Sequence, residues 1–182
     1  MNKVKLTNDI TVSSVCLGAM NFGTSTDEKS SYAVLDAYIS AGGNFIDTSN
    51  NYAHWQGTGD ESETLLGKYL RERGNRDKLI IATKVGFDRH GEGAGLKKAQ
   101  IEYWIDESLR KLGTDYVDLY YAHTDDVGTP LEETMAAFDS LVKNGKVRVL
   151  GGSNYDTWRF MEANAVEARK RYVPAMASAA RK

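Results

Sequence analysis

The length, composition and charge of this chain limit what it can be. Its 182 residues are 41% apolar and 26% charged, the balance of one ordinary globular domain, which excludes a fibrous or an intrinsically disordered protein. Lys and Arg total 23 against 25 Asp and Glu, so there is no basic excess to neutralise phosphates, and a nucleic-acid partner is not expected.

The opening segment and the short apolar runs favour a cytoplasmic protein. Residues 1–9, MNKVKLTND, lack the apolar core of a signal peptide, and no apolar run approaches a membrane span. We therefore predict a cytoplasmic location and no membrane partner. Cys16 is the single cysteine, so neither an internal disulfide nor a thiolate metal cluster is expected, and no metal is predicted. Its apolar neighbours predict that Cys16 packs in a strand.

In chain order, the first predicted element is a β-hairpin. Two short alternating stretches flank the turn dipeptide Asn8 and Asp9, which is the pattern of two paired strands. Five apolar runs predict the strands that follow: Val12–Gly18, Asn44–Asp47, Leu79–Val85, Val117–Ala122 and Val147–Gly151.

Segments with helical spacing separate these runs. The clearest is Lys97–Leu112, with Ile101 and Ile105 on one face and Gly113 as its stop signal. Similar stripes end near Gly42, Gly74 and Gly145. The alternation predicts parallel strands joined by right-handed helical crossovers in a single α/β domain over residues 1–182, with a glycine-rich loop at 86–95.

Four polar side chains lie at or just after the ends of predicted strands, at the edge where parallel α/β folds bind ligands: Asp47, Tyr52, Lys84 and His123. Each has a structural alternative, namely a turn cap, loop packing, a lysine reaching solvent, and a hydrogen-bonded strand histidine. Considered together they favour a catalytic role, because a lysine at the end of an apolar strand needs a carboxylate partner, which Asp47 can provide.

This combination suits the reduction of a carbonyl group. A nearby ammonium favours the phenolate form of a tyrosine, so Lys84 is expected to lower the pKa of Tyr52 and make it a useful general acid. Asp47 would hold Lys84 in place. His123 would donate a second hydrogen bond to the carbonyl oxygen as that oxygen gains negative charge.

Four segments carry a family resemblance: DTSNNY at 47–52, ESETLLGKYL at 61–70, IIATKVG at 80–86 and ESLRKLGTDYVDLYYAH at 107–123. In order and spacing they resemble the aldo-keto reductases, and GKVRVLGGSN at 145–154 extends the resemblance from Ser14 to about Ala165. It implies a (βα)8 TIM-type barrel with Asp47, Tyr52, Lys84 and His123 as catalytic tetrad and Tyr52 as proton donor.

The same resemblance implies a cofactor site for NADPH, with NADH as the alternative. It assigns Ser153 and Asn154 to the nicotinamide carboxamide, and it places Gly18, Ala19, Met20 and Asp47 near the nicotinamide ribose. Ser153 and Asn154 could otherwise cap a helix. No strand-linked G-x-G-x-x-G motif is present, so a Rossmann site is not expected. Phe22 and Trp55, in strand-end loops, are candidate walls for a small-molecule aldehyde or ketone, with ordinary packing as the alternative.

The chain departs from the family pattern in its length. The family barrel needs roughly 250 residues, whereas five strands can be traced here, followed by a divergent tail at 166–182. We therefore expect an incomplete barrel that binds NADPH weakly, with open sheet edges for self-association. The alternatives to a reductase are a non-catalytic, self-associating fragment and an accessory binding subunit like the potassium-channel subunits of this fold.

Overall fold

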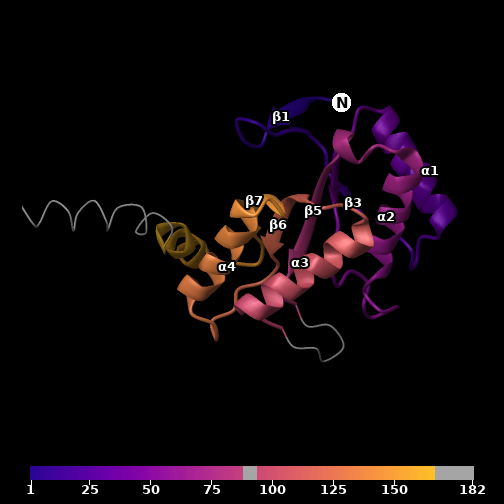
Figure 1. The fold of residues 1–182 in the computed structure, drawn as a ribbon. Coiled ribbons are helices and arrows are strands. Elements are labelled where there is room, and N and C mark those ends of the chain that lie inside the picture. The colour runs from indigo at the N-terminus through magenta and orange to yellow at the C-terminus, as the bar shows by residue number, and fades with distance from the viewer. Residues whose placement is uncertain (88–93, 167–182) are drawn as a thin grey trace, which may run out of the picture.

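A five-stranded parallel sheet with helices packed on it organises the chain (Figure 1). The structure, a computed structural model, describes residues 1–87 and 94–166. Its elements are β1 Lys3–Lys5, β2 Thr11–Ser13, β3 Leu17–Gly18, α1 Glu28–Ser40, β4 Phe45–Asp47, α2 Glu61–Arg73, the short 3-10 helix η1 Arg76–Lys78, β5 Ile80–Val85, α3 Lys98–Leu112, β6 Val117–Ala122, α4 Leu131–Lys143 and β7 Val147–Gly152. Residues 157–166 form a further helix.

The strand order explains why this is part of a barrel. The sheet runs β3-β4-β5-β6-β7, so every crossover moves to the next neighbour in the same direction. Because such crossovers are right-handed, the connecting helices fall on one face, as Figure 1 shows for α1 to α4. A doubly wound sheet would reverse its order and carry helices on both faces. The predicted fold, five parallel strands of a (βα)8-type barrel, is confirmed.

The predicted N-terminal hairpin is also present. β1 and β2 pair antiparallel with Val4 opposite Val12, and the hairpin lies at one end of the sheet (Figure 1). It is attached there by Asn44, which precedes β4, accepts a hydrogen bond from Ser13 N at 2.6 Å and donates to Thr11 O at 3.1 Å. The hairpin therefore covers the amino ends of the strands, away from the predicted site.

The prediction of one strand over Val12–Gly18 is wrong. The chain leaves the hairpin after β2 and enters the sheet only at β3, because Ser13 Oγ bonds back to Val15 O at 2.8 Å and turns the backbone. Cys16 lies in this connection and is exposed, so the prediction that it packs in a strand is wrong too. The other four predicted strands agree with β4 to β7 within one residue at each end.

Local sequence signals account for the helices. α3 begins after Lys97 and ends at Gly113, whose φ of 65° is the left-handed conformation that glycine adopts without strain. α2 and α3 approach closely at Gly67, where an added Cβ would lie 2.0 Å from the Lys111 carbonyl oxygen. The core lies between the helices and the sheet and includes Leu35, Ile81, Ile105 and Tyr120.

Parts of two predicted segments lie outside the described residues. The loop predicted at 86–95 is described at 86–87 and 94–95, and the predicted tail at 166–182 is described at residue 166. In the ranges 1–87 and 94–166, none of the helices has the length and apolar character needed to cross a bilayer.

Candidate active site

The sheet register brings the four predicted catalytic residues to one edge. Asp47 is the last residue of β4 and pairs with Gly18 on one side and Ala82 on the other. Lys84 lies two residues beyond Ala82 in β5, and His123 directly follows β6, with its backbone N–H bonded to Val85 O at 2.7 Å. Parallel strands end together, so these side chains share the carboxyl edge of the sheet.

Lys84 is the centre of the cluster. Its Nζ donates to Asp47 Oδ2 at 2.6 Å, to the Thr48 carbonyl oxygen at 2.8 Å and to Tyr52 Oη at 2.5 Å. These three acceptors use all three donors of an ammonium group, although the residue is only 7% exposed. The Tyr52 hydroxyl in turn donates to Asp47 Oδ2 at 2.7 Å. Asp47, Tyr52 and Lys84 thus form a closed triangle of hydrogen bonds.

The pKa of Tyr52 is raised in the structure, whereas the sequence led us to expect that it is lowered. Burial, and next the Asp47 carboxylate, raise the pKa of Tyr52 above its usual value of 10. Burial lowers the pKa of Lys84, while the Asp47 carboxylate opposes that shift. Tyr52 is therefore held as a neutral phenol that keeps its proton until a base approaches. The expectation that Lys84 brings the phenol pKa down is not met in this state of the site.

His123 is held as a neutral ring. Burial, and next the nearby Lys84 ammonium, lower the pKa of His123 from 6.5 to about 4. Its Nδ1 lies 3.3 Å from Ser49 Oγ, and Ser49 donates its own hydrogen to Asn51 Oδ1 at 2.7 Å. Ser49 is then an acceptor toward His123, which places the ring hydrogen on Nδ1. A hydrogen bond from the other nitrogen to a substrate requires the opposite tautomer.

The residues that the resemblance assigns to the cofactor lie along the same edge. Gly18 pairs with Asp47, and an added Cβ at Gly18 would meet nothing within 4 Å, so the space beside it is open. Asn154 adopts a left-handed φ of 56°, and its Nδ2 donates to the His123 carbonyl oxygen at 2.7 Å and to Ser153 Oγ at 3.1 Å. Neither Ser153 nor Asn154 caps the helix at 157–166, since Phe160 N bonds to Asp156 O.

An open cavity of about 450 Å³ lies beside the tetrad. It is lined by Met20, Asn51, Tyr52, His54, Trp55, Phe87 and His123. Trp55, 60% exposed, lies in this lining, and its contact with a substrate stays a prediction. The prediction for Phe22 is wrong, because this side chain is 5% exposed and packs in the hydrophobic core.

Sequence reasoning missed several residues around this cavity. Phe87 stacks edge-on against His123, with ring centroids 4.5 Å apart. Thr48 provides a carbonyl acceptor for Lys84, and Ser49 contacts the His123 ring. Thr48 and Ser49 stand in the DTSNNY segment, and Phe87 follows the strand of Lys84, so proximity along the chain was the available signal.

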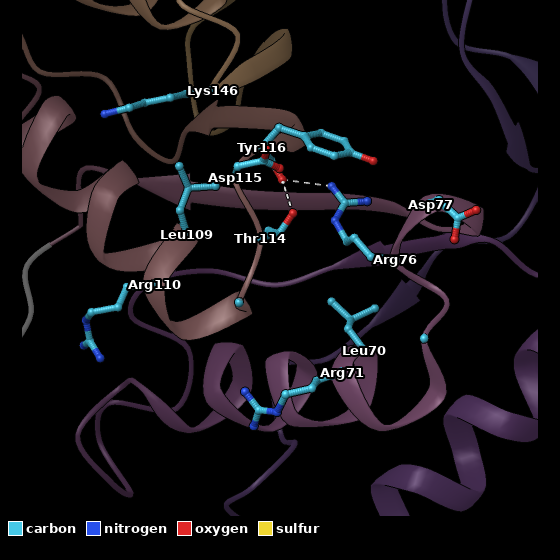
Figure 2. A pocket seen from close by; sticks show the side chains of 12 residues that line it. Leu70, Arg71, Arg76, Asp77, Leu109, Arg110, Thr114, Asp115, Tyr116 and Lys146 are labelled. Atoms are coloured by element: carbon cyan, nitrogen blue, oxygen red, sulfur yellow. Dashed lines mark hydrogen bonds between the residues drawn. The ribbon is translucent and has the colours of Figure 1, made fainter.

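A larger groove, of about 960 Å³, lies at the opposite edge of the sheet and is shown in Figure 2. It is formed where α2 and α3 end and where β5, β6 and β7 begin, and none of the tetrad residues lines it. Its Arg76 is bonded to protein atoms, including the Tyr116 carbonyl oxygen at 3.0 Å (Figure 2). The groove is therefore separate from the candidate site.

Fold and site together define an α/β protein of the barrel type, with an aspartate, tyrosine and lysine cluster at the carboxyl ends of its strands. The model of the "Aldo/keto reductase family" matches residues 14–181. This chain belongs to the aldo/keto reductase family. The match continues beyond Ala165, where the resemblance was expected to fade.

Three relatives illustrate the similarity. "Uncharacterized oxidoreductase YrpG" of Bacillus subtilis is 36% identical, covering 89% of this chain and 52% of the relative. "Aldo-keto reductase ausK" of Aspergillus calidoustus is 40% identical, covering 87% and 43%. "Norsolorinic acid reductase B" of Aspergillus parasiticus is 39% identical, covering 85% and 43%. The chain thus spans about half the length of the curated relatives it matches.

Proposed function

We propose that this chain carries the catalytic part of an NADPH-dependent reductase that converts an aldehyde or ketone into an alcohol. One observation carries the proposal: the buried Lys84 ammonium donates at once to Asp47 and Tyr52, beside an open cavity lined by Trp55 and Phe87. A phenol and an ammonium in direct contact are suited to handing a proton to a developing oxyanion.

The proton-transfer step follows from the hydrogen bonds. When bound, NADPH supplies the hydride that the carbonyl carbon accepts. The carbonyl oxygen takes the Tyr52 proton, for which the Tyr52 hydroxyl turns from Asp47 toward the cavity. The phenolate left behind still accepts from Lys84 Nζ, at 2.5 Å in this structure. This contact offsets the cost of a buried phenolate, which burial and Asp47 otherwise make unfavourable.

The residues at the carboxyl edge of the sheet leave room for the nicotinamide end of the cofactor. The open space at Gly18 and the exposed Met20 leave room beside Asp47, and Ser153 with Asn154 stands at the same edge. We assign these residues to cofactor binding, with NADH as the alternative cofactor. Trp55 and Phe87 would pack against the apolar part of the substrate, and norsolorinic acid, after which one relative is named, is one candidate to try.

The test measures alcohol formation when this protein is mixed with NADPH and a panel of aromatic aldehydes and ketones. We expect alcohol to form in equal amount to the NADPH consumed, and Lys84→Met to lower turnover by at least about 10²-fold. Lys98→Met, which removes an exposed lysine of α3 paired with Glu102, is the matched control. Absence of alcohol from the parent protein, or equal turnover in both variants, contradicts the proposal.

Self-association is a second proposal about partners. Within the described residues, β3 and β7 form the two edges of the sheet, and β7 presents six residues of strand. Such an edge has unpaired N–H and C=O groups that can bond another strand. Light scattering of the 182-residue chain across a concentration series tests this, and a mass equal to one chain at all concentrations contradicts it.

A further inference from the structure

The first turn of α2 carries two polar side chains that the proposed reaction does not use. Ser62 and Glu63 are both 0% exposed, although a serine and a glutamate near a helix start would ordinarily face solvent. Both point from the helix layer toward the sheet and bond to strand ends. Neither residue is among those that line the cavity.

Ser62 joins the ends of β3 and β4. Its hydroxyl donates to the Ala19 carbonyl oxygen at 2.8 Å, just after β3. Its Oγ also lies 2.7 Å from Thr48 Oγ1, just after β4. Since the Ser62 hydrogen goes to Ala19, Thr48 must be the donor in the second bond. One side chain therefore fixes the positions of two strand ends relative to α2.

Glu63 fixes the position of β5 relative to α2 in the same way. Its Oε1 accepts from Thr83 Oγ1 at 2.6 Å, and its Oε2 lies 3.8 Å from Lys111 Nζ of α3. Lys111 also contacts Asp60 Oδ1 at 2.5 Å. A buried carboxylate is costly, and an apolar side chain of similar volume would fill this place at lower cost. Packing alone therefore does not explain Glu63.

The three residues that Ser62 and Glu63 hold, Ala19, Thr48 and Thr83, are next to the Lys84 cluster along the chain or in the sheet. Thr48 follows Asp47, and its carbonyl oxygen accepts from Lys84 Nζ. Thr83 precedes Lys84 in β5, and because strand side chains alternate, Thr83 faces Glu63 of α2 while Lys84 lies on the other face, bonded to Asp47 and Tyr52. Ala19, whose N–H bonds to Asp47 O at 2.8 Å, completes the row.

We propose that Ser62 and Glu63 form a clamp that positions the Lys84 cluster through the ends of β3, β4 and β5. Neither residue touches substrate; both are positioning residues. The assignment of a catalytic purpose rests on the proposed reductase function, whereas the mechanical role of the clamp does not. In the absence of the clamp, the strand ends would keep the backbone bonds that join them but lose their fixed position relative to α2, and Lys84 would lose the simultaneous alignment of its three acceptors.

The test measures how fast the Lys84 ammonium protons exchange with water, by NMR on the 182-residue chain. In the parent chain, three acceptors should make this exchange slow. Ser62→Ala removes two hydrogen bonds and should speed exchange about tenfold. Thr83→Val removes the bond to Glu63 and should also speed exchange. Thr64→Ala, an exposed position on the same turn of α2, is the matched control and should leave exchange unchanged.

Activity measurements separate this inference from the proposed function. In an active protein, Ser62→Ala should lower kcat between about tenfold and about a hundredfold, the scale of a misplaced catalytic group, with KM unchanged. Exchange at the parent rate in both Ser62→Ala and Thr83→Val overturns the clamp, whatever the activity. Faster exchange together with a fully active Lys84→Met supports the clamp and overturns the reductase assignment instead.

Discussion

The two hollows at opposite edges of the sheet differ in what their charged groups do. The amino-edge groove is about 960 Å³ and the carboxyl-edge cavity about 450 Å³. Three cations of the groove each pair with a different carboxylate: Arg110 with Glu107, Lys146 with Asp106 and Arg76 with Asp118. Beside the cavity, Asp47 and Tyr52 both bond to one buried lysine, Lys84. Convergence of side chains on one lysine, rather than size, distinguishes the candidate active site from the groove.

The largest expected effect is a difference in unfolding free energy between a variant of the Lys84 cluster and a variant of the groove. Lys84→Met leaves Asp47 without its cation and should cost about 3 kcal/mol of unfolding free energy, as removal of one partner from a buried pair does. Arg110→Met in the groove breaks an exposed pair and should leave the urea midpoint unchanged. Urea unfolding of both variants checks this. Equal midpoints would show that the Lys84 pair stabilises the fold no more than the exposed groove pair does.

The second-largest effect is expected in the pH dependence of the unfolding free energy, through His123. The pKa of His123 lies at about 4 instead of 6.5, so the fold favours the neutral ring. Its stabilising contribution is therefore complete above pH 6.5 and is lost as the pH falls toward about 4. We expect His123→Gln to remove on the order of 2 to 3 kcal/mol of this pH dependence. Urea unfolding at several pH values checks it. An identical pH dependence in parent and variant contradicts the assignment.

A groove variant should affect stability without affecting chemistry. Arg76 bonds to Leu79 O, Tyr116 O and Asp118 Oδ2, and its guanidinium lies 4.1 Å from the Tyr116 ring centroid. Arg76→Lys loses this planar fork and should cost about 2 kcal/mol, while kcat measured below the unfolding temperature stays at the parent value. A fall in kcat of tenfold or more, on the scale set by about 1.4 kcal/mol, would show that the groove influences the reaction.

The smallest effect concerns the tautomer of His123. In this structure Ser49 accepts from Nδ1, which disfavours a hydrogen on the other ring nitrogen. Ser49→Ala removes that acceptor and should shift the tautomer balance by roughly 1 kcal/mol, the value of one hydrogen bond. Nitrogen NMR of labelled histidine reports the tautomer directly, and an unchanged spectrum would show that Ser49 does not set it.

The strand ends were predictable from sequence because apolar runs stop where the chain leaves the sheet. The apolar runs that predicted β4 to β7 stop near polar or glycine residues at the carboxyl edge of the sheet. This is why the sequence indicated Asp47, Lys84 and His123 as candidate site residues. The first run failed because apolar character alone does not show that Ser13 turns the backbone between β2 and β3.

Other features depend on contacts that no local pattern records. Phe22 occupies a strand-end loop, yet it turns into the core. Ser62 and Glu63 occupy polar positions of a helical pattern, which indicates an exposed face, and only the packing of α2 on the sheet buries them. The direction of the Tyr52 pKa shift likewise depends on its burial and on its contact with Asp47, neither of which spacing reveals.

Turnover of Tyr52→Phe, compared with the parent protein, tests the central claim most directly. The substitution keeps the ring and removes the hydroxyl that bonds to Asp47 and Lys84, so it deletes the proposed proton donor with little change in packing. Tyr103→Phe, on the exposed face of α3, is the matched control. We predict that kcat falls by at least about 10²-fold in Tyr52→Phe and stays unchanged in Tyr103→Phe. Parent-level turnover in Tyr52→Phe would contradict the account.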